Sequence, residues 1–509
     1  MKPRVLILFL LAAVCAGSDF AWGQSGKPTV ERPNVLFLAV DDMKDWVGCL
    51  GGYEGTVHTP NIDRLAARGV LFTNAHCPSP KCAPSRAAIM TGLMPSTTGL
   101  YENSHWWKPN LPEVVSLPAQ FKAHGYRVAG AGKIFHHTAG NNPPGEWDEF
   151  RRLIFRNDGW FREKKINYPW STPVPFPEGF PFSEVEGLPH ENDWGALPGV
   201  PEADYDDTLS ADFAVEFLRT HEPDQPFFLA CGLFRPHLPW YVPREYFDLY
   251  PLDEIVLPEV REGDLDDVPE VGRQLALAGH SDFEKIRDAD RWKHAIQAYL
   301  ASISYADAQL GRVLEALDIS PHAENTYVTL WSDHGWHLGE KGHWHKSTLW
   351  EEATRVPFLF AGPGIEPAKC DRPVSLISLF PTLNDLCGLP LIENHDGVSL
   401  RPLLEDPASA SWGRPAVIEY LLGNAAVRSD RFRYIRYHDG SEELYDHETD
   451  PHEWDNLAKN PEQASVIANL ARWLPENWAP EAKAKGAFQF DPETWTWREK
   501  KTNRVIEGR

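Results

Sequence analysis

The amino-acid sequence predicts an α/β fold in which a doubly wound, mostly parallel sheet is followed by a smaller C-terminal α+β subdomain. Continuous apolar runs alternate with amphipathic stretches along most of the chain, as expected for buried parallel strands joined by helices. From about residue 416 the runs become short and closely spaced, which is typical of an antiparallel sheet. A chain of 509 residues with a hydrophobic content of 42% can build two or three domains of this kind.

Each strand of the large sheet is predicted from an apolar run that ends at polar residues. These runs cover residues 34–40, 70–74, 126–131, 226–233, 325–331 and 356–360. Helices are predicted between them, with Gly69, Gly92 and Gly125 as stop signals. The predicted helices cover residues 62–68, 82–91, 114–124, 207–220, 288–317 and 376–386.

Two long segments lack any sustained period and are predicted to be irregular insertions. Residues 139 to about 204 are rich in Pro, Gly, Trp and Asp, and the second segment covers roughly residues 241 to 285. Beyond them, three short strands and a helix are expected at residues 426–428, 432–437, 442–445 and 461–474. We therefore expect a larger domain at residues 31–390 and a C-terminal subdomain at residues 391–509.

The N-terminus has the features of a secretory signal peptide at residues 1–23. Lys2 and Arg4 precede an apolar run, and Ala21-Trp22-Gly23 places small residues where a signal peptidase reads them. The run is too short to span a bilayer, and no later stretch is apolar enough for a transmembrane helix. We expect an exported protein, periplasmic or secreted, that begins near Gln24.

The formal net charge of −24 argues against a nucleic-acid partner, because a phosphate backbone needs neutralisation by Lys and Arg. It also gives no long-range attraction for a polyanionic substrate. Any selectivity for anions must therefore come from cations placed locally in a site.

The seven cysteines match neither a zinc motif nor a disulfide framework. Cys15 lies within the predicted signal peptide, where a lipoprotein anchor is an alternative to cleavage. Bulky Val14 directly precedes it, so we favour cleavage and a soluble product.

Chemically active side chains follow four of the predicted strands, at the points where these strands end. In an open parallel sheet, ligands bind outside the carboxyl ends of the strands. Four sets from distant segments are harder to attribute to ordinary loop composition than one set would be. The residues are Asp41 and Asp42, Lys133 and His136, His237, and Asp333 and His334.

The pentapeptide Cys82-Ala83-Pro84-Ser85-Arg86 stands at the start of a short predicted helix. A residue at this position meets outward-pointing backbone N–H groups, and Arg86 adds a permanent cation, so the position favours negative charge. A single cysteine before a helix is most often only a packed residue. Here the combination suits a nucleophile that acts on a tetrahedral oxyanion, such as a sulfate or phosphate ester.

The string Cys82-x-Pro84-Ser85-Arg86 resembles the signature of the type I sulfatases. The longer run over residues 82–101 looks like the iduronate-2-sulfatase branch of that family. The resemblance covers about residues 33–457 and implies an alkaline-phosphatase-like fold, with residues 31–390 as the sulfatase catalytic domain. It also implies that a formylglycine-generating enzyme oxidises Cys82 to formylglycine (3-oxoalanine) during maturation.

A divalent metal site is expected from carboxylates at two strand ends, since their hard oxygens suit Ca²⁺ and also Mg²⁺. Taken alone, an Asp-Asp pair after a strand more often serves a turn or a helix cap. Most sulfatases have Asn where this chain has His334, so the imidazole supports the narrower branch and leaves the choice of metal open. The resemblance implies as metal ligands Asp41, Asp42, Cys82, Asp333 and His334.

The resemblance also implies a role for each group around the nucleophile. Cys82, as the hydrated aldehyde, would attack sulfur, while Arg86 and Lys133 hold the diol and stabilise its oxyanion. His136 would abstract a proton from the second hydroxyl, so that the aldehyde is regenerated and sulfate leaves.

The substrate side of the site is expected to combine cations with aromatic residues. His237 and Lys346 would bind the sulfate group, and one of them would protonate the leaving alcohol. His343 and His345 add pH-sensitive groups near the proposed sulfate site. Four further residues are expected to shape the substrate pocket, namely His105, Trp106, Trp107 and Trp336.

These observations lead to one hypothesis and two alternatives. The hypothesis is an exported, metal-dependent hydrolase that removes O-sulfate from a sulfated carbohydrate, with the 2-O-sulfate of a uronic acid such as iduronate as the candidate target. One alternative is a phosphodiester or phosphonate ester hydrolase of the same superfamily. The other is a carbohydrate-binding pseudo-sulfatase in which Cys82 stays a thiol.

Overall fold

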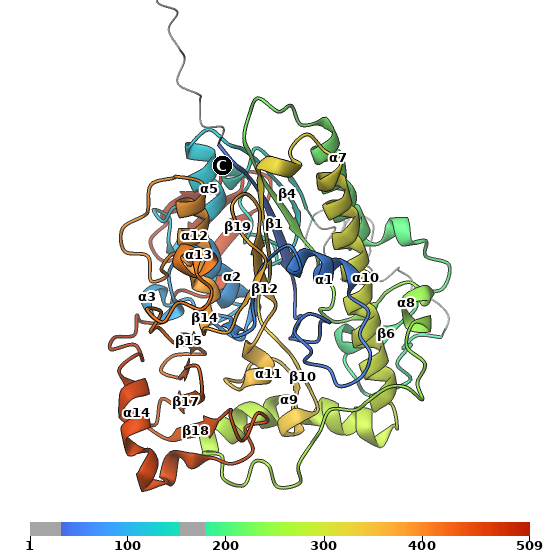
Figure 1. The fold of residues 1–509 in the computed structure, drawn as a ribbon, viewed down its shortest axis with the longest axis vertical. Helices are drawn as coiled ribbons and strands as arrows, with labels where there is room; N and C mark the ends of the chain where they lie inside the picture. The colour runs from blue at the N-terminus through green and yellow to red at the C-terminus, as the bar shows by residue number, and fades with distance from the viewer. Residues whose placement is uncertain (1–31, 153–178) are drawn as a thin grey trace, which may run out of the picture. The chain divides into compact units, whose positions relative to one another are not determined.

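An eight-stranded sheet lies at the centre of the computed structural model, which describes residues 32–152 and 179–509 (Figure 1). The order of its strands is β13-β2-β12-β9-β1-β7-β4-β5, and all neighbours are parallel except at β12, which is antiparallel to β2 and β9. The strands are β1 (Asn34–Val40), β2 (Gly69–Phe72), β4 (Arg127–Gly132), β5 (Glu149–Arg151), β7 (Phe227–Gly232), β9 (Thr326–Ser332), β12 (Phe358–Ala361) and β13 (Ala368–Cys370). The predicted mostly parallel sheet is confirmed.

Strand β1 shows why the apolar runs form the centre of this sheet. All seven of its residues are buried, and its neighbours β7 and β9 run parallel to it on either side. Leu36 and Leu38 face one hydrophobic cluster, whereas Val35 and Phe37 face another. A strand that is buried on both faces needs apolar residues at every position rather than at alternate ones.

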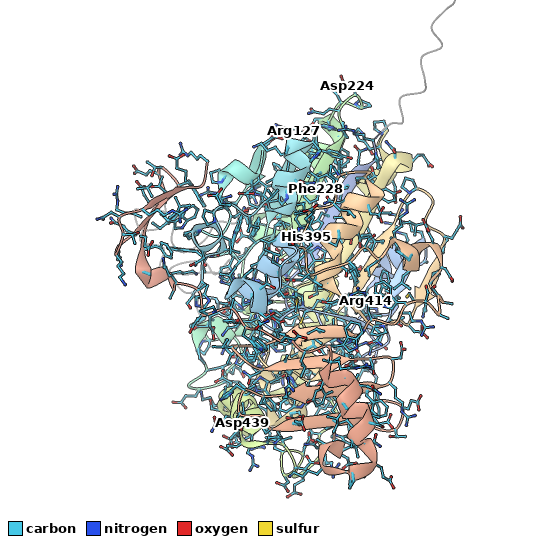
Figure 2. All side chains as sticks on the ribbon, turned by 90° about the vertical axis from the view of Figure 1, so that its left-hand side faces the viewer. Arg127, Asp224, Phe228, His395, Arg414 and Asp439 are labelled. Atoms are coloured by element: carbon cyan, nitrogen blue, oxygen red, sulfur yellow. The ribbon has the colours of Figure 1, made fainter. Side chains whose placement is uncertain are left out.

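Helices cover both faces of the sheet, as the doubly wound prediction requires (Figure 1). On one face lie α1 (Pro60–Ala66), α7 (Asp206–Thr220) and α10 (Trp292–Asp318). On the other face lie α2 (Cys82–Thr91), α5 (Leu117–Ala123) and α12 (Leu379–Leu386). In Figure 2 the labelled Phe228 of β7 lies in the interior, while Asp224 and Asp439 lie toward opposite ends.

The two insertions contain more regular structure than the sequence predicted. In the second, the prediction of an irregular segment is wrong, because α8 (Arg244–Asp248) and the 19-residue α9 (Glu270–Asp288) lie there. The buried face of α9 combines Phe283 and Ile286 with Gly272, Ala276 and Gly279, and glycine is an unfavourable residue in a helix interior. In the first insertion, β5 adds an edge strand to the main sheet, and residues 153–178 lie outside the described part.

The C-terminal region contains the predicted antiparallel sheet and one that was not predicted. The predicted sheet consists of β15 (Ala416–Glu419), β16 (Ala425–Arg428), β17 (Phe432–Arg436) and β18 (Glu442–Asp446), and α14 (Ala464–Ala471) packs on it. The additional sheet consists of β19 (Phe488–Asp491), β20 (Thr496–Glu499) and β21 (Val505–Glu507). Residues 33–509 form one compact unit, so the expected boundary near residue 390 stays a prediction.

Short elements connect the larger ones and carry several residues discussed below. They are β3 (Ala75–His76), β6 (Trp194–Gly195), β8 (Trp240–Tyr241), β10 (His337–Leu338), β11 (Trp344–His345), β14 (Val374–Ser375), α3 (Pro95–Thr98), α4 (Trp107–Asn110), α11 (Glu351–Thr354) and α13 (Arg401–Glu405). Within residues 32–152 and 179–509, no helix is both long and apolar enough to cross a membrane. The predicted signal peptide lies outside the described residues.

Candidate active site

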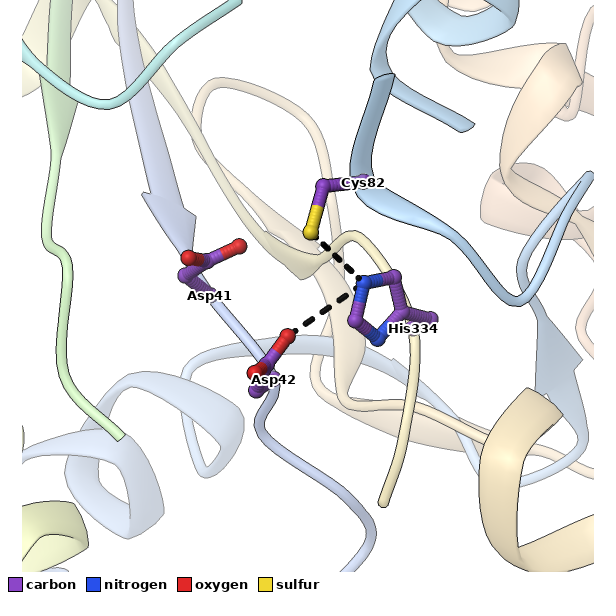
Figure 3. A group of neighbouring side chains, drawn as sticks. All are labelled: Asp41, Asp42, Cys82 and His334. Carbon is purple, nitrogen blue, oxygen red and sulfur yellow. Dashed lines mark hydrogen bonds and ion pairs between the residues drawn. The ribbon is translucent and has the colours of Figure 1, made fainter. Parts of the chain in front are cut away.

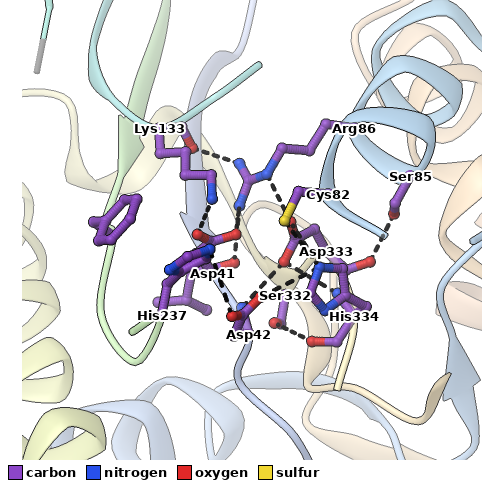
Figure 4. A network of polar contacts seen from close by, with 12 residues as sticks. Asp41, Asp42, Cys82, Ser85, Arg86, Lys133, His237, Ser332, Asp333 and His334 are labelled. Atoms are coloured by element: carbon purple, nitrogen blue, oxygen red, sulfur yellow. Dashed lines mark hydrogen bonds and ion pairs between the residues drawn. The ribbon is translucent and has the colours of Figure 1, made fainter. Parts of the chain in front are cut away.

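The side chains that follow the strand ends meet at one edge of the sheet, beside the start of α2 (Figure 4). The loops after β1, β4, β7 and β9 each contribute residues, and α2 adds its first turn. The loop between β11 and α11 contributes one more cation, Lys346. Hydrogen bonds and ion pairs connect these side chains into one network, which consists of Asp41, Asp42, Cys82, Arg86, Lys133, His237, Asp333, His334 and Lys346.

Cys82 is the first residue of α2, and its thiol lies within this network. Its Sγ is 3.0 Å from Lys346 Nζ and 3.2 Å from His334 Nε2. The Ser85 hydroxyl donates to the carbonyl of Asp333 at 2.6 Å and so ties the first turn of α2 to the end of β9. The chemistry of residue 82 therefore takes place at a fixed point among cations and carboxylates.

Four of these side chains form a group that could hold a metal ion (Figure 3). Ligand atoms of Asp41, Asp42, Cys82 and His334 all lie within 4.8 Å of one another, and all four residues are buried. Burial raises the pKa of Asp41 and raises that of Asp42 to about 7. A divalent cation would offset this burial cost, and the two carboxylates and the imidazole suit such a cation.

Asp333 lies beside this four-residue group and is occupied by hydrogen bonds. Its Oδ1 accepts from the backbone N–H of Asp42 at 3.2 Å, and its Oδ2 accepts from Arg86 Nε at 2.8 Å. Burial alone would raise the pKa of Asp333, but the charges of Arg86 and His334 bring it well below the usual range. Asp333 is thus a permanent anion that orders its neighbours, and its expected part in metal binding stays a prediction.

Arg86 is fully buried and holds three strand ends in place. Besides its bonds to Asp333 and Asp41, its guanidinium donates to the backbone carbonyls of Lys133, Ile134 and Val40 at 2.5, 3.0 and 3.3 Å. A guanidinium offers five donors in a fixed plane, so a lysine could not replace this set of contacts.

Asp42 adopts an unusual backbone conformation, with a φ of 61°. Few residues other than glycine occupy this region, so the surrounding structure has to hold it there. The backbone N–H of Asp42 donates to Asp333, and the Tyr299 hydroxyl from α10 donates to the Asp42 carbonyl at 2.7 Å. The conformation turns the two consecutive carboxylates toward the same group of ligands.

The loop after β4 brings Lys133 and His136 to the site. Lys133 Nζ forms an ion pair with Asp41, and both side chains are fully buried. Burial lowers the pKa of His136 well below its usual value, and the charges of Lys133 and Lys485 lower it further. His136 is therefore neutral, and its Nδ1 has no hydrogen-bond partner among the described residues.

His237 and Lys346 are the partly exposed members of the network, with side chains that are 16% and 13% exposed. Lys346 Nζ donates to both Asp42 oxygens at 2.7 and 3.0 Å, and His237 Nε2 lies 3.8 Å from Asp42 Oδ2. The other members are at most 1% exposed. A substrate group that enters the site must therefore first meet these two cationic or proton-bearing side chains.

The segment around Lys346 is held in a strained conformation. His345 and Ser347, on either side of it, have φ values of 95° and 82°. The N–H of Ser347 donates to the carbonyl of Pro80 at 3.1 Å, and His343 Nε2 lies 2.8 Å from the Lys346 carbonyl. Burial lowers the pKa of His343 to about 4, so this histidine does not add the cation that we expected. Its contact with the Lys346 carbonyl instead helps to position Lys346.

The four residues expected to shape the substrate pocket occupy different surroundings. Trp106 packs against the β19–β20–β21 sheet, and Trp107 stacks on Phe135, while both indole N–H groups donate to backbone carbonyls. His105 is buried beside Glu481. Trp336 lies at the site, where its ring centroid is 5.2 Å from Lys346 Nζ. A role in substrate contact stays a prediction for all four residues.

Three residues near the site were not found from the sequence. His137 packs between His136 and His237 and could have been noted, because it directly follows a predicted site residue. Tyr299 is one of many apolar and aromatic residues in a long helix, and nothing local marks its hydroxyl. Lys485 reaches the loop of His136 from the C-terminal region.

Two models of known protein families match the sequence of this chain. The family model described as Sulfatase matches residues 33–389, and the model described as N-sulphoglucosamine sulphohydrolase, C-terminal, matches residues 339–479. The chain therefore belongs to the sulfatase family, and it is a sulfuric ester hydrolase.

Individual proteins and solved structures are also similar to this chain. A protein named Sulfatase from Formosa agariphila is 40% identical over 507 residues, which cover 96% of this chain and 95% of that protein. Human iduronate 2-sulfatase is 32% identical over 430 residues, which cover 75% and 73% of the two chains. The structure of the phosphonate monoester hydrolase of Agrobacterium radiobacter superimposes with a TM-score of 0.72 at 23% identity, covering 87% of this chain and 94% of that one. The alkaline-phosphatase-like fold is thus confirmed.

Proposed function

We propose that this sulfatase removes an O-sulfate group from a sulfated carbohydrate, with the 2-O-sulfate of a uronic acid as its target. The observation that carries the proposal is the position of Cys82 at the start of α2, with Lys346 and His334 on its sulfur and two aspartates beside it. The choice of the 2-O position is supported by the 32% identity with human iduronate 2-sulfatase.

The nucleophile in this proposal is Cys82 after conversion to formylglycine, which brings oxygen to the place of the thiol. The thiol itself is a softer ligand than the neighbouring carboxylates, so an oxygen there suits a hard divalent cation better. The sequence Cys82-x-Pro84-Ser85-Arg86, which resembles the site that the formylglycine-generating enzyme reads, supports this step.

The residues around position 82 have separate tasks in the proposed reaction. The partly exposed Lys346 and His237 bind the sulfate group of the substrate, and one of them donates the proton that the departing sugar alkoxide needs. Arg86 and Lys133 supply positive charge next to the carboxylates and the nucleophile. His136, which is neutral, accepts the proton released at residue 82.

A divalent metal, Ca²⁺ or Mg²⁺, completes the proposed site. It would be held by Asp41, Asp42, His334 and residue 82, whose ligand atoms lie within 4.8 Å of one another, together with the neighbouring Asp333. When bound, it would supply Lewis-acid polarisation of oxygen atoms at this position.

We also propose that the protein is exported and acts in the periplasm or outside the cell. The features of residues 1–23 support cleavage of a signal peptide. Such a location would give direct access to sulfated polysaccharides.

The test is release of inorganic sulfate from a 2-O-sulfated hexuronate disaccharide by the native protein, together with the mass of the peptide that carries Cys82. We expect sulfate release and a peptide roughly 18 Da lighter than the thiol form, as formylglycine requires. Hydrolysis of a phosphonate monoester in a parallel assay, without release of sulfate from the disaccharide, would favour the phosphonate hydrolase alternative. An unmodified thiol in active protein would overturn the proposed nucleophile.

A further inference from the structure

The C-terminal segment over residues 479–485 runs along the chain that follows α2. Three backbone N–H groups of this segment donate to carbonyls of that chain at 2.7 to 2.8 Å. The pairs are Ala479 with Ser96, Ala482 with Gly99, and Lys485 with Ser104. The matched C-terminal family model ends at residue 479, so most of this segment lies beyond it.

This arrangement brings Lys485 to the loop that carries two proposed catalytic residues. Lys485 Nζ donates to Thr138 Oγ1 at 2.8 Å, and Thr138 follows His136 by two residues. His136 experiences the positive charge of Lys485 together with those of Lys133, Lys346 and Arg86. Lys485 therefore stands near His136, although Lys485 and Thr138 lie 347 positions apart along the chain.

Lys485 differs from the other three cations in its partners. Arg86, Lys133 and Lys346 each form an ion pair with an aspartate. No carboxylate in residues 32–152 and 179–509 forms an ion pair with Lys485, and its Nζ lies 5.8 Å from the ring centroid of Trp106. Burial lowers the pKa of Lys485 to about 8 with no anion to offset it. An ammonium group in such surroundings gains stability when an anion binds to it.

Thr138 has a donor available for the same anion. Its Oγ1 accepts hydrogen bonds from Lys485 Nζ at 2.8 Å and from Asn141 Nδ2 at 2.7 Å. A hydroxyl accepts two hydrogen bonds and donates one, so the hydrogen of Thr138 remains free for an acceptor. An ammonium and a hydroxyl side by side can bind one oxyanion with two hydrogen bonds.

We propose that Lys485 and Thr138 form a subsite for a second oxyanion on the substrate, either a carboxylate or a further sulfate of the sugar that carries the scissile group. This inference rests on the proposed function, because it places the second anion beside the sulfate that is removed. In this proposal the C-terminal segment, which is far from the cysteine motif in the sequence, contributes to the selectivity of the enzyme among sulfated sugars.

The test compares variants on substrates that differ in their second anion. The variants are Lys485→Gln, Lys485→Arg and Thr138→Val, and the matched control is Lys483→Gln. Lys483 belongs to the same segment, but its Nζ pairs with Glu499 at 2.6 Å and its side chain is 55% exposed. The substrates are a 2-O-sulfated hexuronate disaccharide, its carboxyl-reduced form, a carboxyl-reduced form with a second sulfate, and 4-nitrophenyl sulfate.

We expect Lys485→Gln to raise the KM for the carboxylated disaccharide by about 10- to 100-fold, the usual loss when a hydrogen bond to a charged group is removed. Lys485→Arg should recover most of this loss, and Lys483→Gln should behave as the wild type. The effect on 4-nitrophenyl sulfate, which carries no second anion, should be much smaller. A large effect that is confined to the disulfated, carboxyl-reduced sugar would identify the oxyanion as sulfate.

A binding measurement separates this inference from the proposed reaction. In a Cys82→Ala background, Lys485→Gln should weaken the Kd for the carboxylated disaccharide about tenfold or more, whereas Lys483→Gln should not. If the wild type releases no sulfate but this difference in Kd is present, the subsite stands and the proposed reaction fails. If sulfate is released but Lys485→Gln affects all substrates equally, or none, the subsite is wrong.

Discussion

Among the described residues, two clusters of acidic and basic side chains could hold a metal ion, and one of them has the properties of a reactive centre. The first is the site at the strand ends, with Asp41, Asp42, Cys82 and His334. The second lies where α11 meets the C-terminal sheet, and it brings together Glu351, His447 and Glu453. Both groups place three or more possible metal ligands within 4.8 Å of one another.

The cations that surround each cluster make the difference. In the second cluster, Arg433 forms ion pairs with Glu351 and Glu453, and Arg428 Nε donates to Glu351 at 3.1 Å. Burial would raise the pKa values of Glu351 and Glu453, but the arginines and His447 lower both below the usual range. The carboxylates are thus fully compensated and serve to join two parts of the fold.

In the first cluster the compensation is incomplete. Burial raises the pKa values of Asp41 and Asp42 despite the lysines beside them. A cation that binds to Asp41 and Asp42 offsets the free-energy cost of burying these two carboxylates. A cation in the second cluster would have to displace an arginine. The comparison teaches that the kind and placement of the cations, rather than the number of ligands, distinguish a structural cluster from a reactive one.

The largest expected effect concerns the nucleophile of the first cluster. We expect Cys82→Ala to lower kcat/KM for sulfate ester hydrolysis by at least about 10⁴-fold, since the group that attacks is absent. Cys77→Ala is the control, because Cys77 is another buried thiol, whose Sγ faces the carbonyl of Ala353 outside the network. Sulfate release by both variants is measured by ion chromatography, and thermal unfolding verifies that both variants are folded. Equal losses in both variants would show that packing is responsible.

The second cluster should contribute to the stability of the fold rather than to catalysis. Arg433→Ala leaves Glu351 and Glu453 buried without their main partner, which should lower the free energy of unfolding by about 3–5 kcal/mol. The kcat of the protein that remains folded should be unchanged. Arg261→Ala, which removes an exposed ion pair with Asp455, serves as the control and should not change stability measurably. Denaturant unfolding checks both variants, and a stable Arg433→Ala protein would contradict the role assigned to this cluster.

Metal binding gives a third way to separate the two clusters. With free Ca²⁺ at 100 times its Kd, the free energy of unfolding of the wild type should rise by about 2.7 kcal/mol. Asp42→Asn should lose this increment because it removes a proposed ligand, whereas Glu453→Gln should keep it. Unfolding with and without chelator measures the increment for each variant. An increment that survives in Asp42→Asn and disappears in Glu453→Gln would place the metal in the second cluster.

The sequence predicted the first cluster well because each member lies in a short, local pattern. Asp41 and Asp333 stand directly after buried strands, and His237 lies in the loop that follows β7; the topology of a parallel sheet brings such positions together. Cys82 stands at the start of a helix within a pentapeptide that is recognisable by itself. Local pattern and topology together therefore predicted which residues meet.

The sequence did not predict residues whose position depends on contacts between distant segments. Lys485 meets Thr138 only because the C-terminal segment pairs with the chain after α2. Helix α9 was missed because it needs glycines on its buried face, where the carbonyl of Trp344 would lie 2.0 Å from a Cβ at Gly279. A close approach of two backbones selects glycine, and glycine in the sequence argues against a helix by its intrinsic propensity.

The smallest expected effect distinguishes two buried tryptophans, one beside Lys346 and one in the core. Trp336 and Trp344 are both buried, and neither indole Nε1 has a hydrogen-bond partner among the described residues. Trp336 lies beside Lys346, whereas Trp344 stacks on Phe283 in the core. If the N–H of Trp336 binds the substrate, Trp336→Phe should raise the KM for the sulfated disaccharide about 2- to 10-fold, the net value of one hydrogen bond.

Trp344→Phe removes an equivalent N–H from the core and should leave the KM unchanged, while any loss of packing should appear in thermal unfolding. Steady-state kinetics on both variants measure the difference. An equal rise in KM for the two variants would mean that the indole rings act only by supporting the segment of Lys346. A rise for Trp336→Phe alone would show that the orphan N–H groups near the first cluster, unlike those in the core, have a partner in the substrate.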